Sequence, residues 1–87
     1  MNKKLYTIKP LKWEYNENIS MHRGYNNHGN LKYEIEHKFP VSFEAFELNV
    51  HREWYRNCIG SFTTLDKAKD ACQARYERDM AELLDEQ

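Results

Sequence analysis

The hydrophobic period of this 87-residue chain changes once, and that change limits the folds open to it. Before Thr63, apolar and polar residues alternate in several segments, which is the period of half-buried strands. After Thr64, apolar residues recur every three or four positions, which is typical of an amphipathic helix packed on a core. Strands followed by a single helix predict an α+β fold. The helical stripe comprises Leu65, Ala68, Cys72, Tyr76, Met80, Leu83 and Leu84.

The strand-like segments predict an antiparallel meander of about four strands, with a helix over residues 64–84 packed on one face. Either Thr63 or Thr64 is a suitable N-cap for this helix, and Thr63 with Asp66 fits a capping box. The four predicted strands are Leu11–Tyr15, Tyr33–Phe39, Phe43–Val50 and Trp54–Phe62.

Alternation also predicts which side chains face the core. In the third segment, Phe46, Leu48 and Val50 are expected to face inward and Glu47 outward. In the fourth segment, Ile59 is expected on the face opposite Cys58, Gly60 and Phe62.

The stretch from Asn16 to Asn30 differs from the rest of the chain. It contains five Asn and two Gly, residue types that accept left-handed backbone and form turns. We therefore predict a long loop over 16–30, with a short strand at Ile19–Tyr25 as the alternative. Loops of this length in compact domains are often functional.

Composition fits one soluble domain spanning residues 1–87, with 40% apolar and 31% charged residues. The net charge of −1 argues against a strongly basic nucleic-acid module and against an acidic DNA mimic. Neither a signal peptide nor a membrane span is expected, because no sufficiently long apolar run occurs. Two cysteines are fewer than small secreted domains usually carry, which favours a cytoplasmic location.

The sequence offers no pattern typical of a metal or catalytic site. The four His and two Cys residues form neither a C-x2-C nor an H-x3-5-H pair, so we expect no metal, no cofactor and two core cysteines. Glu34 and Glu36 alternate on one strand, as solvated glutamates do, and Cys58 with His51 has no nucleophile signature. We predict a protein that is not an enzyme.

A cluster of aromatic and cationic residues is the best candidate for a binding site. Tyr, Trp and Arg dominate protein interfaces because they bury large areas at low entropic cost. The same residue types also suit stacking on single-stranded nucleic acid, and the first thirty residues carry five basic against two acidic side chains. A homodimer through a sheet edge or face is a third possibility. The candidate interface residues are Arg23, Tyr25, Arg52, Trp54, Tyr55 and Arg56.

Parts of the chain resemble a group of small phage and prophage proteins of unknown function. The resemblance covers about half of the chain: Leu11–Glu14, Tyr33–Ile35, and a strand–helix tail. The 16–30 insertion and Lys67, where an acidic residue is usual, depart from the pattern. The tail comprises Ile59-Gly60-Ser61-Phe62, Thr64-Leu65-Asp66-Lys67-Ala68-Lys69, Ala71-Cys72-Gln73-Ala74 and Tyr76-Glu77-Arg78.

The resemblance implies a phage or prophage origin and hence action in the cytoplasm of a host cell. Small accessory proteins of that origin often bind and block a host protein, including defence nucleases. We therefore hypothesise stoichiometric binding to a host protein, with nucleic acid as the weaker alternative and a homodimer left open.

Overall fold

The computed structural model describes residues 8–38, 40–49 and 55–85. Its fold is a five-stranded antiparallel meander followed by one helix, in the order β1-β2-β3-β4-β5-α1. The α+β fold and the meander are thus confirmed, with five strands in place of four. The strands are β1 (Lys12–Asn16), β2 (Met21–Tyr25), β3 (Leu31–Lys38), β4 (Ser42–Asn49) and β5 (Tyr55–Phe62), and the helix is α1 (Leu65–Asp85).

The additional strand is β2, so the short strand offered within Ile19–Tyr25 is confirmed over residues 21–25, and an unbroken loop across 16–30 is wrong there. The asparagines instead form two short turns on either side of β2. The Asn16 side chain accepts the backbone N–H of Asn18. The Asn26 side chain accepts the N–H groups of His28 and Asn30. This local bonding replaces the ladder bonds that the backbone loses at a turn.

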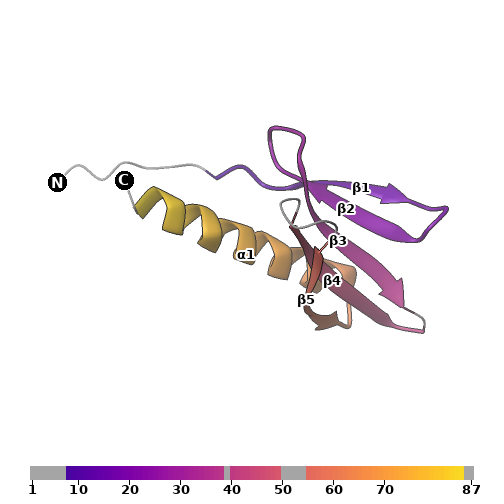
Figure 1. Cartoon of the computed structure of the whole chain (residues 1–87). Coiled ribbons are helices and arrows are strands. Elements are labelled where there is room, and N and C mark those ends of the chain that lie inside the picture. The colour runs from indigo at the N-terminus through magenta and orange to yellow at the C-terminus, as the bar shows by residue number, and fades with distance from the viewer. Residues whose placement is uncertain (1–7, 39, 50–54, 86–87) are drawn as a thin grey trace.

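The helix begins as the sequence indicates and ends within one residue of the prediction. Thr64 is the N-cap, because its hydroxyl accepts the backbone N–H of Lys67 at 3.1 Å. This contact resolves the choice between the two threonines in favour of Thr64. Figure 1 shows the first half of α1 against the sheet and its later turns extending past the strands.

The core lies between α1 and the central strands. Ala68, Cys72 and Tyr76 of the helix pack against the sheet, as their spacing predicts. The Tyr33 and Tyr76 rings meet edge-to-face, with centroids 6.5 Å apart. On the sheet side the buried residues of the cluster are Tyr33, Ile35 and Ala45, and Leu11 completes it ahead of β1.

The predicted orientation of β4 is wrong. Glu47 faces the helix, where Arg75 donates to it at 3.0 Å, and Phe46 lies on the other face. Phe43 and Ala45 take the inward positions instead. Leu48 lines a small cleft beside Tyr76, and Val50 falls outside the described residues.

A register shift between β4 and β5 explains the error in β5. The shift lies between Ala45 and Phe46, which pair with Gly60 and Cys58, so Ile59 is an extra residue on β5. Ile59 and Phe62 therefore both pack against the core. Cys58 is exposed rather than buried, which corrects the expectation of two core cysteines.

Replacing Tyr76 tests the helix register. Tyr76 is 7% exposed and contacts the Tyr33 ring edge-on, so Tyr76→Ala should lower the free energy of unfolding by about 3 kcal/mol or more. The control Arg78→Ala alters an exposed side chain of the same helix and should change stability by less than about 0.5 kcal/mol. Urea denaturation followed by circular dichroism measures both values, and equal stabilities would contradict the packing described.

Candidate functional site

The face of the sheet turned away from α1, called here the open face, collects two of the candidate interface residues. Arg23 on β2 and Arg56 on β5 lie far apart in sequence but meet on this face around Glu34 of β3. Tyr25 also lies on β2, next to Arg23 in a shallow hollow. Tyr55 is the first residue of β5. Arg52 and Trp54 lie outside the described residues.

Glu34 is the centre of this arrangement. Its side chain is 12% exposed, and each carboxylate oxygen faces a different arginine. Arg23 donates through Nε to Oε2 at 3.2 Å, while Nε of Arg56 lies 3.7 Å from Oε1. A carboxylate taken this far out of water needs such partners, because burial of an unpaired charge is costly.

Arg56 is held by more than charge. Its guanidinium carbon lies 3.8 Å from the centroid of the Phe46 ring, in cation–π distance. Its Nη2 also lies 3.8 Å from Glu36, which in turn lies 3.6 Å from Lys38. Because one planar group contacts a ring and two carboxylates, its position on the open face is fixed before any partner arrives.

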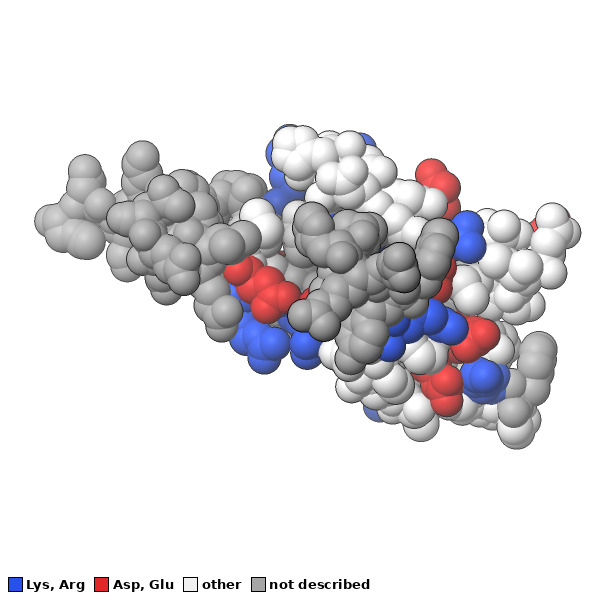
Figure 2. Space-filling model, viewed as in Figure 1, with Lys and Arg blue, Asp and Glu red and all other residues white. Residues whose placement is uncertain are grey.

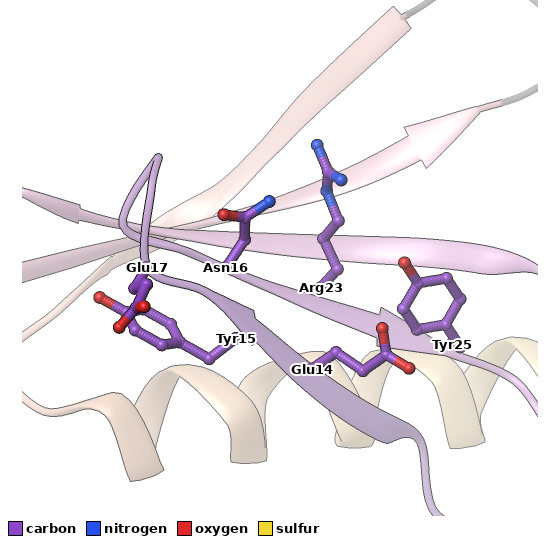
Figure 3. Close-up of a pocket in the computed structure, with 6 residues that line it drawn as sticks. All are labelled: Glu14, Tyr15, Asn16, Glu17, Arg23 and Tyr25. Atoms are coloured by element: carbon purple, nitrogen blue, oxygen red, sulfur yellow. The ribbon is translucent and has the colours of Figure 1, made fainter.

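At the margin of the open face, β1 and β2 border a hollow of about 350 Å³. Figure 3 shows Arg23 and Asn16 projecting to the same side of the ribbon, with Glu14 and Tyr25 close to one another. The lining combines both charge signs with tyrosine, which suits contact with a polar protein surface more than capture of an apolar small molecule.

The side of the sheet that faces α1 carries a different group of ionisable residues. The His22 ring lies tilted against the Tyr15 ring, with centroids 4.4 Å apart. Burial, together with nearby Lys69 and His37, lowers the pKa of His22 below 6.5. Lys69 also lies 5.8 Å from the centroid of the Trp13 ring. Trp13 crosses Gly24 so closely that a Cβ there would meet the ring at 2.8 Å. The first and last of these contacts lie within the β1–β2 hairpin, and the Lys69–Trp13 contact links the hairpin to α1.

The two cysteines lie in different environments, and His51, the residue considered beside Cys58, lies outside the described residues. Cys72 is fully buried, and burial raises the pKa of its thiol to about 12, so it stays protonated. Burial likewise raises the pKa of Tyr33. Cys58 is a free thiol on the opposite face. Within the described residues, no three His, Cys, Asp or Glu side chains form a cluster that could hold a metal ion.

Two residues of this site, Glu34 and Phe46, were not among the predicted interface residues. Alternation along the strand predicts that Glu34 and Glu36 are both solvated, because it does not show which residues of neighbouring strands lie beside them. The partners that bury it come from β2 and β5. The sequence held one small indication of such a carboxylate partner. Arg23 and Arg56 each lie on a strand-like segment that contains no acidic residue to pair with them.

Comparisons of the chain with protein-family models, with curated proteins and with solved structures find no match. The described part of the chain has no helix that is both long and apolar enough to cross a membrane.

The pairing around Glu34 predicts an asymmetric response to substitution. Replacing both arginines, as Arg23→Met with Arg56→Met, keeps their apolar stems but leaves a buried carboxylate unpaired, and should cost about 2–3 kcal/mol of stability. In a Glu34→Gln background the same two replacements should cost less than about 1 kcal/mol, because no buried charge remains. Denaturant titration of wild type, the double arginine variant, Glu34→Gln and the triple variant gives the coupling free energy between Glu34 and the two arginines. Equal costs in both backgrounds would show that Glu34 is not paired as described.

The lowered pKa of His22 predicts a loss of stability in mild acid. Below pH 6.5 the unfolded chain binds a proton at His22 more readily than the folded chain, so the free energy of unfolding falls with pH through the folded-state pKa. His22→Gln should flatten this part of the stability profile. His28→Gln, at an exposed turn position, should leave it unchanged. Melting temperatures measured between pH 5 and 8 compare the three proteins. If wild type and His22→Gln lose stability identically as the pH falls, His22 is not the cause of the loss.

Proposed function

We propose that this chain is a non-enzymatic binding protein that associates one-to-one with another protein through the open face of its sheet. The observation that carries this proposal is the fixed position of Arg56, stacked on Phe46 and held by Glu34 and Glu36. Arginine and aromatic side chains contribute most to protein interfaces, and side chains ordered in advance lose little entropy on binding.

The class of partner is inferred from the sequence. The strand–helix tail resembles small phage and prophage proteins, so the proposed partner is a protein of a bacterial host, with inhibition of a host defence system as the role. Action in the host cytoplasm follows from the same inference.

The charges on the open face favour a protein partner over nucleic acid. Arg23 and Arg56 are both matched by carboxylates within 4 Å, so they bring little net positive charge to a phosphate backbone. Figure 2 shows acidic and basic side chains interspersed over the face in view rather than gathered by sign. Mixed charge of this kind suits the polar rim of a protein interface.

Affinity capture followed by substitution tests the proposal. The tagged chain is incubated with lysate of a bacterial host, co-purifying proteins are identified by mass spectrometry, and the recovered partner is titrated calorimetrically. Arg56→Ala should weaken binding by about 30-fold or more, as truncation of an interface anchor does. The control Arg78→Ala, on an exposed part of α1, should bind like wild type.

Three outcomes would count against the proposal. Unchanged affinity for Arg56→Ala, with circular dichroism showing both chains folded, would remove the open face as the interface. Stoichiometry other than one-to-one would contradict the mode of action. Sub-micromolar binding of single-stranded DNA or RNA at physiological salt, weakening steeply as salt rises, would favour the nucleic-acid alternative.

A further inference from the structure

The two margins of the sheet differ in how well they are protected against pairing with another chain. β1 and β5 are the outer strands. β5 carries an extra residue at its register shift against β4, and such bulges twist an edge away from further pairing. β1 pairs with β2 residue by residue from Lys12 to Asn16 without a shift. The regular edge of the sheet is therefore β1, drawn at one margin in Figure 1.

The strand β1 has few of the features that block edge pairing. Its five residues include no Pro or Gly, and its two charged residues, Lys12 and Glu14, have opposite signs. Tyr15 is 54% exposed, and Ile19 in the adjoining turn is 47% exposed, so apolar area is available at this end of the sheet. Among the elements that the structure describes, the helix packs on β3, β4 and β5, and β1 pairs with β2 alone.

In one register, the charged residues of one β1 strand lie opposite residues of the opposite charge in a second copy of β1. If two β1 strands pair antiparallel around a two-fold axis at Trp13, Lys12 of each copy lies opposite Glu14 of the other. Both side chains are exposed on the same face of the strand, so the two ion pairs form on one side of the joined sheet. An axis at Lys12 or at Glu14 instead places identical charges opposite one another, and an axis at Tyr15 makes no ion pair.

We propose that β1 is a self-association edge, and that two copies of this chain join antiparallel through it into one continuous ten-stranded sheet. The register is the one centred on Trp13, with Lys12 and Glu14 paired across the interface. The backbone N–H of Leu11 is already bonded to Gln73, so the new ladder is confined to β1 itself. So short a ladder buries little area, which makes the dimer weak and concentration-dependent. The inference is independent of the proposed partner on the open face.

Reciprocal charge reversal tests both the edge and the register. Sedimentation equilibrium of the untagged chain, up to about 1 mM, should show wild type approaching twice the 10.6 kDa chain mass. Lys12→Glu and Glu14→Lys should each weaken self-association at least about tenfold, because each places like charges opposite one another twice. An equimolar mixture of these two variants should dimerise again, since every cross-strand pair in the mixed dimer has opposite signs. The double variant Lys12→Glu with Glu14→Lys should likewise behave as wild type.

The control variant is Lys67→Glu, an exposed reversal on the helix, which should leave self-association unchanged. Circular dichroism confirms that each chain is folded, because Glu14 also lies opposite Arg23 within the sheet. A wild-type chain that stays monomeric throughout would overturn the proposal. So would single variants that dimerise as well as wild type, or a mixture that fails to recover the dimer.

Discussion

The packing of the α1 stripe on the central strands determines the rest of this structure. Ala68, Cys72 and Tyr76 occupy one face of the sheet together with Tyr33 and Ile35. A chain of this size has room for only one such core. Because the helix covers that face and successive side chains of a strand point to opposite faces, the β3 residues that alternate with Tyr33 and Ile35 must lie on the other face. The position of the helix therefore decides what the open face contains.

The open face carries a carboxylate that the helix itself never touches. Glu34 follows a buried tyrosine and precedes a buried isoleucine, so its backbone position is fixed by the core. With neighbouring strands on both sides its side chain is largely shielded, and two arginines compensate the lost hydration. Arg56 gains a fixed orientation from this role. A requirement of folding thus produces the ordered cationic and aromatic surface on which the proposed function rests.

Two separate surfaces emerge from this arrangement, each governed by different physics. The open face presents ordered side chains, so affinity there depends on shape and on a few anchors. The β1 margin presents backbone groups flanked by Lys12 and Glu14, so affinity there depends on strand pairing and on charge register. β1 and Arg56 lie at opposite ends of the strand order, so Lys12 can be altered apart from the Arg56 site, whereas Glu14 lies opposite Arg23 and borders both surfaces.

The sequence by itself determined the fold class, because the change from period two to period 3.6 is a local signal. It also located α1 within one residue and the Cys72 and Tyr76 positions in the core. Only the tertiary structure decided which face of β4 is inward, since apolar residues lie on both faces of that strand, with Phe43 and Ala45 on one and Phe46 on the other. The bulge at Ile59, which places both Ile59 and Phe62 against the core, is likewise invisible to alternation. For β2 the sequence offered a short strand within Ile19–Tyr25, but its polar residues and Gly24 have low strand propensity, so pairing with β1 and β3 is what establishes it. The Glu34 site belongs to this second group, because its arginines come from two other strands and only the assembled sheet brings them together.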